Sequence, residues 1–187
     1  PAEEVKEALQ PFLNSSEILK IGHNLKYDVT VFKQQWGIEF GGQLADTLIA
    51  AYLTESGERS LKLDDLCQAR GLRLTSFAEV TGKDKRDGCF AFVDIEKAGI
   101  YSCEDVYAAI LLWREFSPLL REKGLDDLFH RVEMPIVTIL AEMELAGICV
   151  DPAVLAALSR EFTEKLAILE KQIYELAGHP FNINSPR

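Results

Sequence analysis

The fold is decided by the stretch Ile18-Leu19-Lys20-Ile21-Gly22-His23-Asn24-Leu25-Lys26-Tyr27-Asp28, in which an apolar run is followed at once by a helical pattern. The run 18–22 has the length and composition of a buried strand. Asn24 is a plausible N-cap, and the helix that it opens is predicted to extend over residues 25–36 and to end at Gly37. This stretch therefore predicts a strand that leads directly into a helix.

The same order recurs immediately downstream. A second short strand is predicted near residues 44–45, and Asp46 is a good N-cap for a helix that extends to Leu53. One helix, over residues 3–13, is expected before the first strand, and another is expected over about 60–70. We therefore expect an α/β domain that is mostly helical and has few strands.

The next segment is a polar stretch followed by a strong helical pattern. Residues 72–92 are polar and are expected to form a loop with a short helix near Phe77. A long helix is predicted over residues 93–116, and Pro118 is expected to end it because proline cannot donate the backbone hydrogen bond of a helix interior.

The character of the sequence changes after Gly124. Helices are expected near residues 125–145 and over 152–177, the second opened by Asp151-Pro152 and closed by Gly178. We place a domain boundary near residue 124, with an α/β part over 1–124 and an all-helical part over 125–187.

Both ends of the sequence have the character of cuts within a longer chain. The sequence opens inside an amphipathic stretch without an initiating methionine. It closes at Asn184-Ser185-Pro186-Arg187, where serine followed by proline is typical of a helix start. We therefore expect a piece of a larger protein.

The net charge of −10 is a poor match for a protein that grips duplex DNA by its phosphates. It suits a carboxylate pocket that holds cations, or a protein whose basic surface lies in another domain, but many cytosolic proteins are acidic.

The four cysteines and three histidines show no zinc-site spacing, and widely spaced single cysteines fit a reducing compartment. Without a signal peptide or a membrane-spanning apolar run, the sequence predicts a cytoplasmic protein with no membrane partner.

Tyr101 and Asp105 form the most informative pair in the sequence. They are four residues apart on a predicted helix and share a face. The helical neighbours of Asp105 are apolar and mostly small, so a buried carboxylate there needs a hydrogen-bond donor or a metal ion. The alternative is that Asp105 accepts hydrogen bonds from another element while Tyr101 packs in the core.

Asp28 lies in or near the first turn of its predicted helix, where the helix dipole favours a negative charge. That ordinary stabilising role is the alternative to a functional one. Together, however, Asp28 and Asp105 are two carboxylates on separate elements of one α/β domain. Such a pair can hold two hard cations for phosphodiester hydrolysis, although a further bridging carboxylate would be required.

The order and spacing of several motifs resemble the proofreading 3′–5′ exonuclease domain of bacterial family A DNA polymerases. The exonuclease motifs are the segment 22–28, Ala45-Asp46-Thr47 and Tyr101-x-x-x-Asp105. The resemblance continues into the start of the polymerase region at residues 132–137, 143–151 and 181–186, so it covers essentially the whole chain.

The resemblance implies a ribonuclease H-like fold that is incomplete here, because the first acidic motif, Asp-x-Glu, belongs upstream of Pro1. It implies two Mg²⁺ or Mn²⁺ ions, with Asp105 a ligand of the first and Asp28 helping to hold the second, largely through water. Tyr101 would orient the attacking water. Residues near the bound DNA strand would be Asn24, Tyr27, Arg59 and Phe77.

The implied activity of the intact parent is removal of nucleotides from a single-stranded DNA 3′ end, with DNA synthesis by the downstream region of the same chain. The isolated chain would be inactive without the first motif. His23 stands where glutamine is common in the family. One alternative is a catalytically silent scaffold domain. Another is a ribonuclease D-like RNA-trimming enzyme, against which the polymerase-like segment 132–186 argues.

Overall fold

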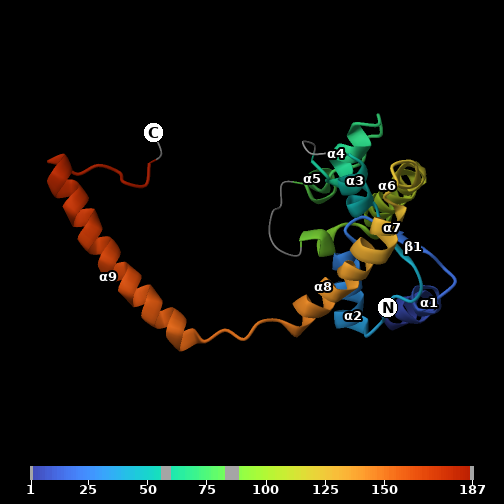
Figure 1. Cartoon of the computed structure of the whole chain (residues 1–187), viewed down its shortest axis with the longest axis horizontal. Coiled ribbons are helices and arrows are strands. Elements are labelled where there is room, and N and C mark those ends of the chain that lie inside the picture. Colours follow the sequence, from blue (N-terminus) through green and yellow to red (C-terminus); the bar gives the residue numbers. More distant parts are fainter. Residues whose placement is uncertain (1, 56–59, 83–88, 186–187) are drawn as a thin grey trace. The chain divides into compact units, whose positions relative to one another are not determined.

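The computed structural model describes residues 2–55, 60–82 and 89–185 (Figure 1). Two compact units divide the chain, one over residues 1–146 and the other over 147–187. In order, the elements are α1 Ala2–Leu13, β1 Lys20–Gly22, α2 Leu25–Trp36, β2 Leu44–Asp46, α3 Thr47–Thr54, α4 Leu63–Gln68, α5 Phe77–Thr81, the 3-10 turn η1 Cys89–Phe92, α6 Ile95–Glu122, α7 Asp126–Leu128, the π-helical turn η2 Phe129–Glu133, α8 Met134–Ala146 and α9 Pro152–Ala177.

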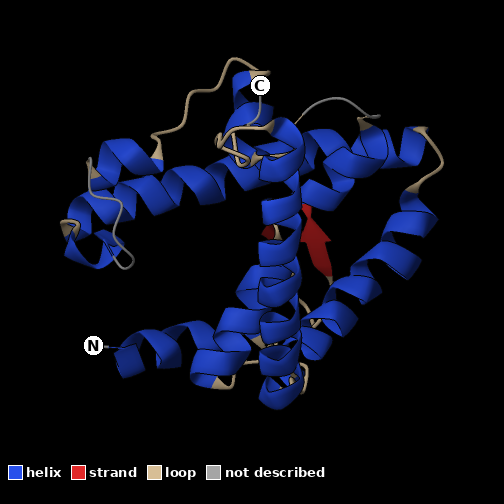
Figure 2. Cartoon of the chain, turned by 90° about the vertical axis from the view of Figure 1, so that its left-hand side faces the viewer, coloured by secondary structure: helices blue, strands red, loops and turns tan. Residues whose placement is uncertain are grey.

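Helices dominate the described part of the chain, which contains one small sheet (Figure 2). Strands β1 and β2 pair in parallel, with Lys20 opposite Leu44 and Gly22 opposite Asp46. Each strand is followed by a helix, and the carboxyl ends of both strands lie at the same edge of the sheet. The expectation of a mostly helical domain with few strands is confirmed.

The helix α6 is longer than predicted, and the expected stop at Pro118 is wrong. The helix continues to Glu122 with Pro118 inside it, and it ends where Gly124 adopts a positive φ of 69°. Proline removes one helical hydrogen bond and costs about 3 kcal/mol in a helix interior. Phe116 and Leu120 flank Pro118 and are both fully buried, so their packing offsets that cost.

The helix predicted near residues 125–145 is confirmed in its extent, since residues 126–146 are helical throughout, but it contains a π-helical turn, η2, between α7 and α8. Pro135 lacks the N–H that a continuous helix would direct to the carbonyl of Arg131. Phe129 turns fully into the core, with its ring centroid 5.5 Å from that of Trp113. Core packing and proline together explain the interruption.

The core of the first unit lies between α3, α4, α6 and the η2–α8 segment. It contains Phe116, Leu112, Leu66, Phe129 and Met134 among its buried residues. The compact unit extends to Ala146, past residue 124, because η2 and α8 pack against α3 and α2. Residue 124 therefore lies inside a compact unit and not at its edge. The division of the chain into an α/β domain and a helical domain near this residue stays a prediction.

The second unit contains α9, whose predicted limits are confirmed. The Asp151 carboxylate accepts hydrogen bonds from the N–H groups of Ala153 and Val154, and Gly178 ends the helix with a positive φ of 74°. The chain then turns back so that the rings of Tyr174 and Phe181 meet edge to face, with centroids 5.7 Å apart. Among the described residues of either unit, no helix has the length and apolar character needed to cross a bilayer.

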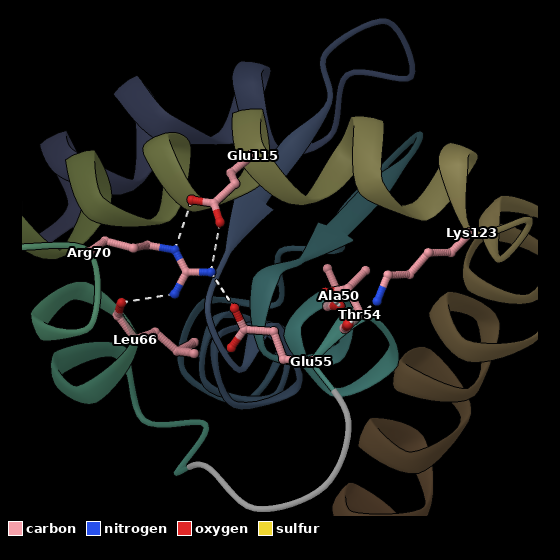
Figure 3. Close-up of polar contacts among 7 residues, drawn as sticks. All are labelled: Ala50, Thr54, Glu55, Leu66, Arg70, Glu115 and Lys123. Carbon is pink, nitrogen blue, oxygen red and sulfur yellow. Dashed lines mark hydrogen bonds and ion pairs between the residues drawn. The ribbon is translucent and has the colours of Figure 1, made fainter.

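Arg70 ties three elements of the first unit together (Figure 3). It donates from Nε and Nη2 to the two carboxylate oxygens of Glu115 on α6, both at 2.8 Å. It also donates to Glu55 at the end of α3 and to the carbonyl of Leu66 in α4. Its guanidinium carbon lies 4.9 Å from the ring centroid of Phe116.

Replacing Arg70 with methionine is expected to lower the free energy of unfolding by about 1–3 kcal/mol, because two carboxylates and a carbonyl lose their donor. Urea denaturation of the chain measures this change. Arg73→Met is the matched control, since Arg73 is 86% exposed and pairs with Glu79 only at the surface. Equal effects of the two substitutions would contradict a stabilising role for the Arg70 network.

Candidate active site

One pocket of the first unit is lined by both Asp28 and Asp105. Its volume is about 470 Å³, and its walls come from β1, the β1–α2 turn, α2 and α6, with Leu13, Phe40 and Leu63 completing the lining. Asp28 lies in the first turn of α2, and Asp105 lies near the middle of α6. The structure therefore brings together two carboxylates that are 77 positions apart in the sequence.

The turn from β1 into α2 differs from the prediction in how it is capped. Asn24 has a left-handed conformation, with φ 64°, and its side chain makes no capping hydrogen bond. Instead the Asp46 carboxylate accepts from the backbone N–H groups of Asn24 and Leu25, at 2.9 and 2.8 Å. Asn24 is therefore the N-cap residue, as predicted, but the capping hydrogen bonds are accepted by an acid from the next strand.

The environment of Asp28 disfavours its ionised form. Burial, and secondarily the negative charge of Asp46, raise the pKa of Asp28 to about 6. These effects outweigh the helix dipole, which acts in the opposite direction. An acid with a raised pKa on a pocket wall is typical of a functional site, since a bound cation would supply the missing compensation.

The raised pKa predicts how stability depends on pH in the absence of metal. Well below pH 3.8 Asp28 is protonated in both the folded and the unfolded chain, and near pH 4 it is protonated in the fold, so its burial carries little charge penalty there. The penalty grows as the pH rises towards about 6 and is constant above it. We expect Asp28→Asn to stabilise the metal-free chain by about 1–2 kcal/mol at pH 8, allowing for partial exposure, and by almost nothing at pH 4.

Urea denaturation at the two pH values, in the presence of a chelator, measures this difference. Asp65→Asn is the control, since Asp65 is exposed in α4 and should show no such pH-dependent gain. A gain at pH 4 as large as that at pH 8 would contradict a buried charge penalty at Asp28.

Asp105 and Tyr101 interact along α6. Burial and then the charge of Asp64 raise the pKa of Asp105, whereas its side-chain hydrogen bond with Tyr101 acts to lower it. Burial and the Asp105 charge raise the pKa of Tyr101, so the tyrosine stays a neutral hydroxyl donor. The partner of Asp105 thus includes a residue of its own helix, and Tyr101 is more than an apolar packing group.

Asp64 also acts on this site, although no sequence motif pointed to it. It lies in the first turn of α4, where its charge acts on Asp105, Tyr101 and Cys67. An acid at a helix start is common, and only the packing of α4 beside α6 brings its charge close enough to act on Asp105.

An aromatic row extends from Tyr101 away from α6. The rings of Tyr101 and Phe90 have centroids 5.8 Å apart, and Phe90 stacks on Phe77 at 5.9 Å with an angle of 18° between the planes. Phe77 is 49% exposed and can accept a base on its free surface. Phe90 was not among the residues predicted from the sequence, because its stacking on Phe77 forms only in the folded chain.

The remaining residues selected from the sequence take different positions. Asn24 and Tyr27 are exposed on the β1–α2 turn and α2, the tyrosine by 67%. Arg59 lies outside the described residues. His23 lines the pocket, and its Nδ1 lies 3.0 Å from the hydroxyl of Thr47. Because that hydroxyl donates to the Gly22 carbonyl, the His23 Nδ1 is the donor of this contact.

The side chains of the pocket fit a divalent cation in kind, since Asp28 and Asp105 offer the oxygen ligands that Mg²⁺ and Mn²⁺ prefer. Both carboxylates carry a desolvation penalty that a cation would relieve. Within residues 2–55, 60–82 and 89–185, no three acidic, histidine or cysteine side chains gather as a metal cluster. The third carboxylate expected from the sequence is therefore not supplied by these residues.

Known proteins resemble this chain over its whole length. Residues 2–121 match the family described as 3′–5′ exonuclease, of the type found in family A DNA polymerases. The DNA polymerase I of Rhizobium leguminosarum is 35% identical over 188 residues, covering 100% of this chain and 18% of that protein. The DNA polymerase I of Chloroflexus aurantiacus is 38% identical over 190 residues, covering 99% and 20%. The chain thus spans about a fifth of the length of these relatives.

A solved structure also matches nearly the whole chain. The POL domain of Pol1 from M. smegmatis, in complex with DNA primer-template and dNTP, matches with a TM-score of 0.67 at 27% identity. The match covers 98% of this chain and 28% of that one. With the family match over residues 2–121 and the relatives over the whole length, the chain belongs to the 3′–5′ exonuclease family of family A DNA polymerases, as its motifs indicated.

Proposed function

We propose that this chain is the part of a family A DNA polymerase that contributes Asp28, Tyr101 and Asp105 to a two-metal 3′–5′ exonuclease site. The observation that carries the proposal is the pocket in which Asp28 of α2 and Asp105 of α6 meet. Both have raised pKa values, as expected for ligands that await a cation. An upstream Asp-x-Glu motif completes the carboxylate set, within a ribonuclease H-like domain that ends near residue 124.

The reaction is hydrolysis of the last phosphodiester bond of a DNA strand. Water adds to phosphorus, the bond to the 3′ oxygen of the preceding nucleotide breaks, and a nucleoside 5′-monophosphate leaves. Divalent cations bound by the carboxylates supply the charge that activates the water and stabilises the leaving oxygen. Asp105 would hold the first cation, and Asp28 would help to hold the second. The Tyr101 hydroxyl, whose pKa is raised by burial and by the charge of Asp105 on the same helix, orients the attacking water.

The substrate is the single-stranded 3′ end of DNA. The exposed rings of Phe77 and Tyr27 offer stacking surfaces for frayed bases, which suits a strand whose terminus is unpaired. Asn24 and Arg59 contribute contacts near the same strand. Residues 125–187 form the beginning of the polymerase domain. That domain synthesises DNA in the cytoplasm of the parent organism.

The test is loss of label from 3′-end-labelled single-stranded DNA with Mg²⁺ or Mn²⁺. This chain is compared with the full-length protein and with the full-length Asp28→Asn, Asp105→Asn double variant. Release of 5′-mononucleotides by the full-length protein alone supports the proposal. Silence of a folded, polymerase-active full-length protein would instead identify the domain as a scaffold, and equal cleavage of RNA would favour an RNA-trimming enzyme.

A further inference from the structure

A single buried carboxylate joins the starts of two helices at the edge of the sheet. Asp46 is the last residue of β2 and is 2% exposed. Its Oδ1 accepts from the N–H groups of Asn24 and Leu48, both at 2.9 Å, and its Oδ2 accepts from that of Leu25 at 2.8 Å. One side chain therefore caps α3, which follows its own strand, and α2, which follows the neighbouring strand.

The hydrogen bonds from the N–H groups of Asn24 and Leu25 to Asp46 stabilise a turn that has no capping hydrogen bond from its own side chain. Asn24 is the single non-glycine residue with a positive φ among those described, and a left-handed residue of this kind carries a conformational cost of about 1 kcal/mol. Its own side chain makes no capping bond. A second tie comes from Thr47, whose hydroxyl donates to the Gly22 carbonyl at 3.0 Å and accepts from His23.

The position of this turn sets the position of Asp28. Asp28 follows Leu25 by three residues, within the first turn of α2. The end of β1 approaches it closely, since a Cβ added at Gly22 would lie 3.7 Å from the Asp28 Oδ2 and 2.6 Å from the Leu25 side chain. A change in the direction of the first turn of α2 would therefore move the Asp28 carboxylate relative to Asp105 across the pocket.

Asp46 is not itself a candidate ligand for a cation in this pocket. It does not line the pocket, and both of its oxygens are already occupied by N–H donors. Its charge also acts on Asp28 through space, but its effect on where the Asp28 carboxylate lies passes through the backbone that it binds. We propose that Asp46 is a positioning residue for the exonuclease site, which fixes the left-handed turn at Asn24 and thereby places Asp28 for metal binding. This inference rests on the proposed function.

The test uses the full-length protein and its Asp46→Asn variant, in which one oxygen remains to accept hydrogen bonds. Asp151→Ala is the matched control, because it removes another aspartate helix cap, that of α9, outside the exonuclease pocket. Three quantities are measured: kcat and KM on single-stranded DNA, Mn²⁺ binding followed by electron paramagnetic resonance, and hydrogen–deuterium exchange of the peptide that contains residues 22–28.

For Asp46→Asn we expect kcat to fall by about 10- to 100-fold while the KM for DNA stays within about twofold, as for a displaced catalytic group. Mn²⁺ binding at the exonuclease site should weaken, and amide exchange in residues 22–28 should accelerate. DNA synthesis should be retained. Asp151→Ala should leave exonuclease kinetics and Mn²⁺ binding at the exonuclease site unchanged.

Unchanged Mn²⁺ binding or unchanged exchange in Asp46→Asn would overturn the positioning role. Equal losses of exonuclease and polymerase activity would also overturn it, because they would indicate general destabilisation. If the wild-type protein degrades no DNA, the proposed function fails, but Mn²⁺ binding and exchange still decide whether Asp46 positions Asp28.

Discussion

Replacing Asp105 with asparagine in the full-length protein is expected to lower 3′–5′ degradation of single-stranded DNA by roughly 100- to 1000-fold, the usual scale for loss of one strong electrostatic contribution to a transition state. Asparagine keeps the shape of the side chain and can still accept a hydrogen bond from Tyr101, but it loses the negative charge that would hold a cation. The measurement is the initial rate of nucleotide release at saturating Mg²⁺.

The same substitution should not destabilise the protein. Burial and the neighbouring Asp64 raise the pKa of Asp105, so its charge is unfavourable in the metal-free fold. The melting temperature of Asp105→Asn without metal should therefore equal or exceed that of the wild type. Asp127→Asn, at an exposed position of α7, is the control for loss of one negative charge. Degradation by Asp105→Asn within a few-fold of the wild-type rate would refute the assignment of Asp105.

Phe116→Ala is expected to lower the free energy of unfolding of the first unit by about 3–5 kcal/mol. Phe116 is fully buried on α6 and belongs to the core cluster. Its removal leaves a cavity and also takes away the ring beneath the Arg70 guanidinium. Because small domains are stable by only about 5–15 kcal/mol, this loss should be visible as a large fall in melting temperature.

The matched control is Phe92→Ala, which removes the same side chain from an 85% exposed position. It should change stability by less than about 0.5 kcal/mol. Both variants are compared with the wild-type chain by thermal and urea denaturation. A loss below about 1 kcal/mol for Phe116→Ala would mean that the core around α6 is not packed as described.

Local signals determined several elements in full. The end of α2 follows from Gly37, whose φ of 66° ends the helix. The start of α3 follows from Asp46, whose side chain accepts from the N–H of Leu48. Asp151, Pro152 and Gly178 define α9 in the same way. In each case the deciding interactions lie within a few residues of the chain, so the sequence alone is sufficient.

Local signals failed where packing between distant segments decided the outcome. Pro118 did not end α6 because Phe116 and Leu120 are both buried in the core on either side of it. The π-helical turn at residues 129–133 follows from the burial of Phe129 against Trp113, 16 positions away. Neither effect could be read from local propensity, because buried apolar area outweighs the cost of one backbone hydrogen bond.

The candidate site, too, was determined partly by the sequence and partly by the tertiary structure. The motifs around Asp28 and Tyr101–Asp105 identified the chemical groups by resemblance. Only the tertiary structure placed Asp64 and Phe90 beside them, raised the pKa of Asp28 to about 6, and supplied Asp46 as the acceptor for the N–H groups at the start of α2. The sequence by itself determined which residues are available, whereas the fold determined which of them meet, because burial and charge coupling depend on distances across space.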